Sequence, residues 1–281
     1  MSDVSAHRIP TPSASGGVTP RRRVRRTFTR RQRWVITVIN LSLFFLIWQL
    51  AATYADIPKL FLPSVGEVFG EMGKMSEEGV LWNNLAISAW IYIVGIAISL
   101  AIAIPLGLLV GGVKILDKIF SSYIWAIYTT PRIILMPLIL LWVGINDTAR
   151  IVIIVLSAVP ATLVVVMDGV KTVDTSLLRA ARSFGASRAR LFRSVVFPST
   201  IPFVATGVRM GVSRGLIGLF IGELFTGANG IGYIIVLAGK TFNSSRTFAM
   251  LLIFVVFCVT MVGLSQMLER KASAWRPTPS A

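Results

Sequence analysis

The sequence has little of the chemistry that enzymes and metalloproteins use. It contains one cysteine, Cys258, inside an apolar run, and one histidine, His7, near the N-terminus. A single cysteine excludes an internal disulfide and any cysteine-rich metal site. A lone terminal histidine leaves most catalytic and metal-binding arrangements without a partner. We therefore expect no cofactor, no metal and no catalytic residue.

Charge is also scarce, because only 14% of the 281 residues are charged while 54% are hydrophobic. The mean hydropathy of +0.75 is typical of a polytopic membrane protein. A net charge of +16 would suggest nucleic-acid binding in a soluble chain. In a membrane chain the distribution of the charges matters more than their sum, so we expect membrane lipid and no nucleic acid as partners.

Apolar segments predict an all-α fold with six transmembrane helices, because most of them approach the roughly 20 residues that cross a bilayer. They cover residues 34–54, 85–112, 119–144, 151–167, 201–225 and 248–268. Prolines interrupt the second, third and fourth segments at Pro105, Pro131, Pro137 and Pro160. Such prolines either bend helices that line a pathway or serve helix packing alone.

Basic residues predict the orientation of these helices. Twenty of the 28 Lys and Arg residues lie in parts that would face the cytoplasm, and five lie in loops outside, Arg150 among them. Both termini are then cytoplasmic, since cytoplasmic loops are rich in Lys and Arg. Residues 1–33 and 270–281 are interpreted as tails, the first of them basic and disordered. The first span and an outer loop with a short helix after Pro63-Ser64 fill residues 34–83, and a transport core fills 84–269.

The longest polar interruption, residues 174–202, lies on the predicted cytoplasmic side. Apolar residues recur at intervals of three or four on each side of Gly185. This spacing predicts two short amphipathic helices joined at that glycine, where a helix ends at little cost. An amphipathic element between apolar spans is interpreted as a docking surface.

The same stretch resembles the EAA loop of bacterial ABC importer permeases. That pattern is Glu-Ala-Ala, three residues, Gly, nine residues, then Ile, any residue and Leu-Pro. Here Arg179-Ala180-Ala181 is followed by Gly185 and by Val195 to Pro198 at the same spacing, with arginine in place of the glutamate. The flanking sequences PRIILMPLILLWVGIND and GLIGLFIGELFTGANGIGYII resemble the nitrate/sulfonate/taurine subfamily. The resemblance implies ATPase coupling through Leu178, Arg179, Ala180, Ala181, Phe184, Gly185 and Pro198.

The resemblance also implies a type I importer permease of the bacterial inner membrane, forming half of a dimeric pore with a second copy of the chain. A separate cytoplasmic ABC ATPase would supply energy, because the chain has no phosphate-binding loop. An extracytoplasmic solute-binding protein would deliver a small anion such as a sulfonate, taurine or nitrate. Some relatives carry aromatic solutes. The alternative, an ATP-independent secondary transporter or channel, lacks duplicated halves and mid-span acidic residues.

The fifth apolar segment has a glycine face, because its glycines are spaced by three or four residues and share one side of a helix. These are Gly207, Gly211, Gly215, Gly218 and Gly222. This face either packs within the subunit, meets a partner subunit or lines the pathway. Arg132, Arg209 and Arg214 lie within spans, where they hold an anion or pair with Glu223, backbone carbonyls or each other. Arg209 and Glu223 are expected on the same side of the helix.

Overall fold

The computed structural model describes residues 30–227 and 229–272, and this part of the chain is helical with no strand. The chain divides into two units, residues 1–47 and residues 48–281, which are described separately. The expected N-terminal tail lies outside the described residues up to residue 29, and the C-terminal tail does so from residue 273. The first unit contains most of helix α1 (Arg30–Tyr54), which ends in the second unit. Its apolar side chains are largely exposed, as expected of a lipid-facing span.

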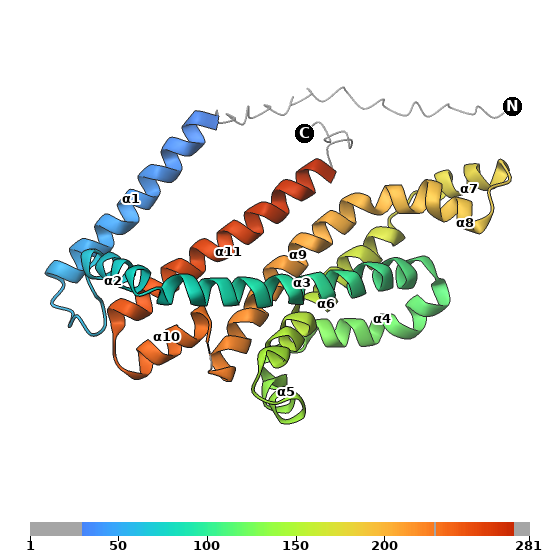
Figure 1. Cartoon of the computed structure of the whole chain (residues 1–281). Helices are drawn as coiled ribbons and strands as arrows, with labels where there is room; N and C mark the ends of the chain where they lie inside the picture. The colour runs from blue at the N-terminus through green and yellow to red at the C-terminus, as the bar shows by residue number, and fades with distance from the viewer. Residues whose placement is uncertain (1–29, 228, 273–281) are drawn as a thin grey trace, which may run out of the picture. The chain divides into compact units, whose positions relative to one another are not determined.

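The second unit is built from the remaining helices (Figure 1). They are α2 (Val65–Glu77), α3 (Val80–Gly112), α4 (Lys114–Thr129), the 3₁₀-helix η1 (Arg132–Leu135), α5 (Met136–Val143), α6 (Asp147–Lys171), α7 (Thr175–Ser183), α8 (Arg188–Leu191), the π-helix η2 (Phe192–Val196), α9 (Phe197–Thr226), α10 (Ile231–Lys240) and α11 (Ser244–Ala272). Five helices in the described part of the chain are long and apolar enough to span a membrane. A bent pair brings the number to six.

The bent pair replaces the third predicted span, residues 119–144. Helix α4 ends at Thr129, and the chain turns by 90° before η1 and α5. Pro131 lies in this break, while Pro105 and Pro160 lie inside the continuous helices α3 and α6. The helix is thus broken at the proline of the third span, whereas the prolines of the second and fourth spans lie within continuous helices. The fourth span is longer than predicted, because α6 extends from Asp147 to Lys171.

Helix α6 is the centre of the second unit. In the most apolar 18-residue stretch of α6, 61% of the residues are buried, compared with 28% or less in the corresponding stretches of the other spanning helices. It packs between α3 and α9 through close backbone contacts. A Cβ at Gly95 of α3 would lie 2.7 Å from Ile154, and one at Gly111 would lie 2.6 Å from the Met167 carbonyl oxygen. Side chains larger than hydrogen at these glycines would force α3 away from α6.

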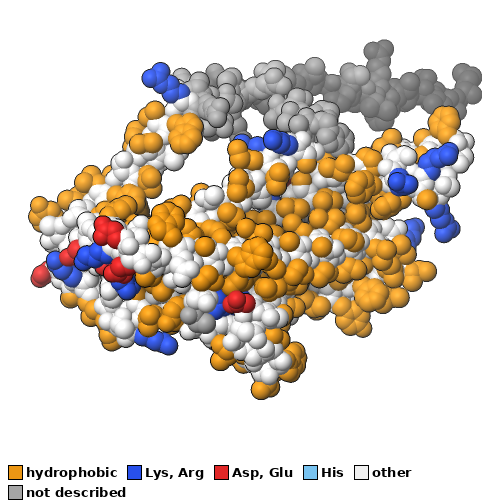
Figure 2. All heavy atoms as spheres, viewed as in Figure 1, with side chains coloured by type: hydrophobic (Ala, Val, Ile, Leu, Met, Phe, Trp, Pro, Cys, Tyr) orange, Lys and Arg blue, Asp and Glu red, His pale blue; other side chains and the backbone are white. Residues whose placement is uncertain are grey.

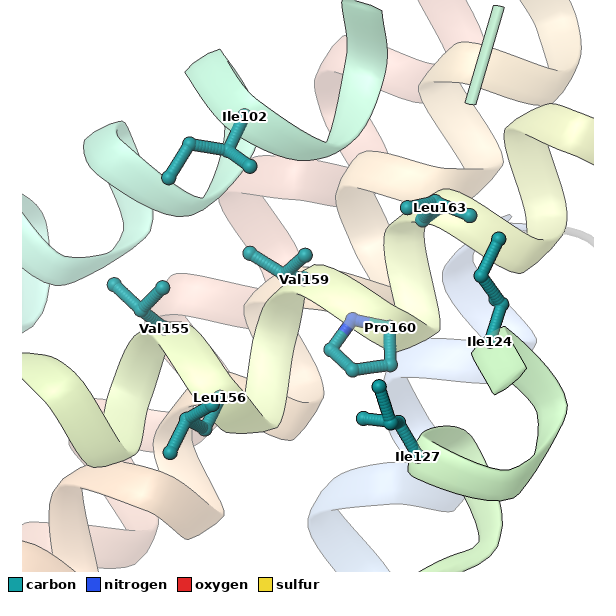
Figure 3. Close-up of a pocket in the computed structure, with 8 residues that line it drawn as sticks. All are labelled: Ile102, Ile124, Ile127, Val155, Leu156, Val159, Pro160 and Leu163. Carbon is teal, nitrogen blue, oxygen red and sulfur yellow. The ribbon is translucent and has the colours of Figure 1, made fainter. Parts of the chain in front are cut away.

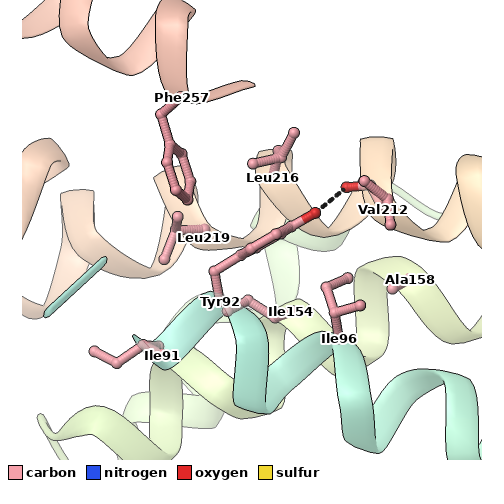
Figure 4. Close-up of a cluster of buried hydrophobic side chains, with 9 residues drawn as sticks. All are labelled: Ile91, Tyr92, Ile96, Ile154, Ala158, Val212, Leu216, Leu219 and Phe257. Carbon is pink, nitrogen blue, oxygen red and sulfur yellow. Dashed lines mark hydrogen bonds between the residues drawn. The ribbon is translucent and has the colours of Figure 1, made fainter. Parts of the chain in front are cut away.

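One apolar cluster joins α3, α6, α9 and α11 (Figure 4). Tyr92 lies in its middle and donates a hydrogen bond of 2.8 Å from its hydroxyl to the carbonyl oxygen of Val212. The ring of Phe257 meets the Tyr92 ring edge-on at 5.7 Å. The bond satisfies the one polar atom of the tyrosine, so the cluster holds the four helices together without leaving the Tyr92 hydroxyl unpaired.

Helix α2 confirms the short helix predicted after Pro63-Ser64. Its capping box is complete, because the Ser64 hydroxyl accepts from Glu67 N at 3.2 Å and the Glu67 carboxylate accepts from Ser64 N at 2.9 Å. The hydrogen bond from Lys59 holds the pKa of the Glu67 carboxyl at about 2. Glu71 of α2 pairs at 2.7 Å with Arg246 of α11, which fastens α2 to a spanning helix.

Figure 2 shows charged side chains gathered near α2 and near α7, with a few others elsewhere and apolar side chains over most of the surface between. The exposed large apolar residues of the second unit include Trp90, Ile93 and Val256. An apolar band between two charged ends is the surface that a bilayer solvates.

Candidate functional site: the coupling loop and the buried charges

The predicted coupling loop forms a helix, a tight turn and a second helix. Asp174 caps α7, and its carboxylate accepts a hydrogen bond of 2.7 Å from Ser176 N. That bond lowers the pKa of the Asp174 carboxyl below its ordinary value, so the cap is an anion at neutral pH. Gly185 ends the helix with a φ of +74°, and Ala186 N donates to the Ala181 carbonyl oxygen at 3.1 Å. A left-handed glycine is the residue this turn favours.

The second helix of the loop is not a separate element, which corrects the prediction of two short helices. Helices α8, η2 and α9 form one continuous helix of 39 residues, Arg188–Thr226. The stretch just before Pro198 is a π-helix, η2. Such wide turns are rare and mark positions where a helix changes direction or accommodates an irregularity. The loop is therefore the beginning of the fifth span.

Helix α7 buries none of its own residues in the chain. Phe184, at its end, is 89% exposed, and Leu177 is 52% exposed. Leu178 and Ala181 are half-buried, whereas Arg179 and Ala180 are exposed. Together these residues give α7 an apolar side with no covering partner among the described residues. Pro198 is half-buried at the start of α9.

The glycine face of α9 is filled by the same chain. A Cβ at Gly218 would lie 2.8 Å from Ser157 Oγ and 2.9 Å from the Ile153 carbonyl oxygen, both on α6. Gly207 and Gly222 also face α6, Gly211 meets Thr162 and Ala158 of α6, and Gly215 meets Ile96 of α3 as well as Ile154 of α6. Of the three alternatives for this face, the geometry matches packing within the subunit. The partner-subunit alternative does not fit, because α6 already occupies the groove.

Glu223 lies 14 residues after Arg209 on α9 and has partners of its own. Its carboxylate is fully buried near the C-terminal end of α9, where it accepts hydrogen bonds from the Ser88 hydroxyl and, at 2.7 Å, from Gly232 N. Ser88 Oγ in turn accepts from Ile231 N at 2.9 Å, and Asn84 Oδ1 accepts from Gly230 N at 2.7 Å. The free N–H groups at the start of α10 are thus bound by side chains of α3 and α9. We call Asn84, Ser88, Glu223 and Arg150 the outer polar cluster.

Arg150 was expected in an outer loop, but its side chain is completely buried at the start of α6. Its Nε donates to Thr226 Oγ1 at 2.7 Å, and its Nη1 donates to Asn229 Oδ1 at 2.6 Å. The sequence analysis missed this residue. The polar pair Asn84 and Ser88, four residues apart in an apolar helix, was the signal that a buried polar partner lay nearby.

The three arginines predicted within spans have different surroundings. Arg209 pairs through Nε with Glu269 of α11 at 2.6 Å, so its charge is compensated. Arg132 donates from Nη2 to the Tyr128 carbonyl oxygen at 2.7 Å. Arg214 is half-buried on α9 and has neither a hydrogen bond nor an ion pair among the described residues. A charge at this depth costs about 2.5–3.5 kcal/mol on insertion scales, so an unpaired arginine needs a reason.

An apolar cavity of about 210 Å³ lies between α3, α4 and α6 (Figure 3). It is lined by Ile102, Ile124, Ile127, Val155, Leu156, Val159, Pro160 and Leu163. These side chains offer no donor or charge for an anion. The cavity therefore bears on the packing of α4 against α6 and not on solute recognition.

Comparison with known proteins gives this arrangement a family. The family described as binding-protein-dependent transport system inner membrane component matches residues 103–274. The taurine transport system permease protein of Escherichia coli is 26% identical over 262 residues, covering 88% of this chain and 94% of its own. A putative aliphatic sulfonates transport permease protein of the same organism is 27% identical, covering 88% and 95%. The riboflavin transport system permease protein of Chloroflexus aurantiacus is 27% identical, covering 84% and 88%.

Solved structures agree in fold. A methionine ABC transporter in inward-facing conformations matches with a TM-score of 0.59 at 20% identity, over 69% of this chain and 96% of that chain. An amino acid ABC transporter matches with a TM-score of 0.56 at 19% identity, over 71% and 97%. Nothing in these likenesses favours a transporter that works without ATP. The chain belongs to the binding-protein-dependent inner membrane components and is a permease subunit of an ABC importer, served by a separate ATPase subunit and a solute-binding protein.

Proposed function

We propose that this permease imports a small organic anion, of which a sulfonate is the best candidate, and that α7 with the Gly185 turn couples import to the ATPase. The observation that carries the coupling proposal is that α7 has an apolar side without a partner in the chain. A solvent-exposed helix of nine residues is not stable by itself. Burial of Phe184, Leu177 and Ala181 in a groove of the ATPase would supply the missing stabilisation.

Substitutions in α7 test the coupling proposal. Ala181→Asp places a carboxylate on the apolar side, where its burial without a partner costs several kcal/mol. Gly185→Val opposes the left-handed turn. Each change should release the ATPase or separate ATP hydrolysis from uptake, measured by co-purification and by uptake into proteoliposomes. Ser183→Asp, an exposed position on the same helix, is the control and should leave coupling intact. Coupled uptake by both altered proteins would contradict the proposal.

Substitution of Arg179 tests whether the ATPase groove presents an acidic residue to α7. The resembling family has glutamate at this position, so the electrostatic contact is reversed or absent here. Arg179→Glu should impair assembly if the ATPase presents an acidic residue to it, since like charges at a contact repel. Unchanged assembly would mean that Arg179, which is exposed in this chain, stays in solvent in the complex. The apolar side chains of α7 alone would then make the contact with the ATPase.

The sulfonate assignment is supported by the printed names of two relatives that align with 88% of the chain. Uptake of radiolabelled taurine and methanesulfonate by the reconstituted complex with its binding protein tests it. ATP-dependent accumulation of a sulfonate supports the assignment. Accumulation of riboflavin and not of a sulfonate would instead make the chain a riboflavin importer, as the name of the third relative indicates for that protein.

The pore is proposed to contain two copies of this chain, surrounded by lipid, with both termini in the cytoplasm. The exposed apolar residues on α4 and α5 suit contact with a second copy.

Glu77→Cys and Ala189→Cys, in a Cys258→Ala background, test the orientation, because both positions are exposed. A membrane-impermeant thiol reagent should label only Glu77→Cys in intact cells. Labelling of Ala189→Cys would reverse the topology. Cross-linking and mass measurement of the complex determine the number of copies.

A further inference from the structure

An open groove follows one side of helix α11 toward its C-terminal end. Its first part is a mostly apolar hollow of about 380 Å³, lined by Cys258, Val259, Val262, Gly263 and Gln266. Its second part is a more polar hollow of about 340 Å³, lined by Arg209 of α9 together with Gln266, Glu269 and Arg270 of α11. Gln266 lines both hollows, so the two adjoin. We call them together the α11 groove, in which an apolar stretch leads into a pocket with two guanidinium groups.

The length and the position of the α11 groove match one leaflet of a bilayer. Cys258 and Arg270 are twelve residues apart, which is about 18 Å along a helix, while half of the hydrocarbon core is about 15 Å thick. Helix α11 has 29 residues and a length of about 43 Å, so its ends extend beyond a core of roughly 30 Å. Arg270 lies two residues before the end of this helix. The polar part of the groove is therefore at the level of the lipid headgroups, and the apolar part is at the level of the acyl chains.

The charges that line the polar part leave an excess of positive charge. Glu269 already has partners, because Arg209 Nε lies 2.6 Å from its Oε2 and the Thr206 hydroxyl donates to its Oε1 at 2.6 Å. Arg270 is exposed and has no ion pair among the residues that the structure describes. The Arg209 side chain is itself 35% exposed. A phosphate in this pocket would meet two guanidiniums, only one of which has a carboxylate partner.

Gly263 keeps the apolar part of the groove open. A Cβ at this position would have no atom within 4 Å, so no described side chain occupies the space beside it. Val259, which also lines this part, is 67% exposed. An apolar hollow at this depth is filled in a membrane, because the surrounding acyl chains are the apolar medium. The space beside Gly263 therefore has room for one acyl chain.

We propose that the α11 groove binds one phospholipid with an anionic headgroup, such as phosphatidylglycerol. The lipid phosphate accepts hydrogen bonds from Arg209 and Arg270, and one acyl chain lies along α11 beside Gly263. Basic residues at the membrane surface attract anionic lipids, and a pocket between two helices adds a defined position for the headgroup. The half-buried amide of Gln266 offers a further donor where the two parts meet. This inference goes beyond the proposed function, because it does not depend on which solute is transported.

Titration of the delipidated permease–ATPase complex with defined lipids tests the site, with native mass spectrometry as the measurement. The wild type should bind phosphatidylglycerol more tightly than phosphatidylcholine with the same acyl chains. Arg270→Gln should weaken the binding of phosphatidylglycerol about five-fold, as expected for one basic residue at an anionic surface, and should leave phosphatidylcholine unaffected. Lys240→Gln, which removes an exposed charge at the end of α10, is the matched control and should bind both lipids as the wild type does.

Gly263→Leu tests the apolar part of the groove without disturbing the packing of the chain. Because a side chain at this position meets open space, the lipid-free complex should melt at the wild-type temperature or slightly above it. The leucine fills the place of the acyl chain, so both lipids should bind more weakly and phosphatidylglycerol should raise the melting temperature less than in the wild type. Leu264→Phe adds bulk on the other side of α11, where the side chain is 51% exposed, and should leave lipid binding unchanged.

Three results would overturn the proposal. The first is binding of phosphatidylglycerol by Arg270→Gln and Gly263→Leu that equals binding by the wild type. The second is stabilisation of the complex by inorganic phosphate as strong as that by phosphatidylglycerol, which would make the polar pocket a site for a free anion. The third is complete cross-linking in membranes of Gly263→Cys, in a Cys258→Ala background, to Ile39→Cys of α1 or to a second copy of the chain. A helix and not a lipid would then occupy the groove.

Discussion

Glutamine in place of Glu223 tests whether the outer polar cluster holds the turn between α9 and α10. The Glu223 carboxylate accepts from Ser88 and from Gly232 N. Glutamine has almost the same shape but turns one acceptor into a donor. In one orientation the new NH₂ group faces the Gly232 N–H, and in the other it faces a hydroxyl whose oxygen already accepts from Ile231 N. In the first orientation the Gly232 N–H loses its acceptor, and in the second the Ser88 hydroxyl proton does, so either way one buried donor is left unpaired.

The size of the effect depends on the charge. Hydrogen bonds between neutral groups in membrane proteins average only about 0.6 kcal/mol, whereas bonds to charged groups contribute about 1.5–3 kcal/mol. We therefore expect Glu223→Gln to destabilise the folded protein by about 2–4 kcal/mol. For a chain of this size that lowers the melting temperature by roughly 5–15 °C.

Thermal unfolding of the purified permease–ATPase complex, followed by fluorescence-detected size exclusion, measures this shift. Glu77→Gln, at an exposed position in the outer region, is the matched control and should not alter the melting temperature. A Glu223→Gln protein that melts with the wild type would refute the argument that this cluster holds the turn.

Three further outcomes follow from local geometry. Asp174→Ala should lower coupled uptake and destabilise α7 by about 0.5–2 kcal/mol, while Asp174→Asn keeps an acceptor and should keep most of the uptake. Because the pKa of the Asp174 carboxyl is lowered in the folded protein, its stabilising effect is complete above the ordinary pKa of an aspartate and is lost as the pH falls below it. A pH series of ATPase binding would detect this loss. Gly218→Ala should destabilise by about 1–3 kcal/mol because α6 leaves no room, whereas Gly263→Ala on α11 meets open space and should stabilise slightly; equal melting temperatures would contradict this. Val159→Ile should fill part of the apolar cavity and raise the melting temperature, unless α4 is displaced, which a lower value would reveal.

Hydrophobic length and local turn chemistry made much of the fold predictable. Long apolar segments located the spanning helices, since a bilayer demands a minimum length. Gly185 in a polar stretch predicted the end of a helix, and the structure places this glycine in a left-handed turn with a φ of +74°. The fourth span was underestimated, because α6 begins with the polar residues Asp147, Thr148 and Arg150, of which only Arg150 is buried by neighbours that local composition does not reveal.

Long-range partners were beyond the reach of the sequence. Arg150 lies in a polar stretch between two apolar segments, so it was placed in a loop. Only the folded chain brings Thr226 and Asn229 to its guanidinium. In the same way, the spacing of the glycines predicted a close helix contact but not that α6 would fill it. Proline spacing did not distinguish the break at Pro131 from the continuous helix at Pro160, because neighbouring packing decides which helix bends.

The uninterrupted helix from Arg188 to Thr226 has a mechanical consequence. At 1.5 Å per residue, its 39 residues form a rod about 58 Å long, with the coupling loop at one end and Glu223 near the other. Residues 207–222 of this rod pack closely against α6 at their glycines, which leaves little room for that section to bend. Its compliant section is the π-helix η2, between the loop and the clamped part. A push on α7 would therefore flex the rod at residues 192–196 first, and only the remaining rotation would reach the outer end.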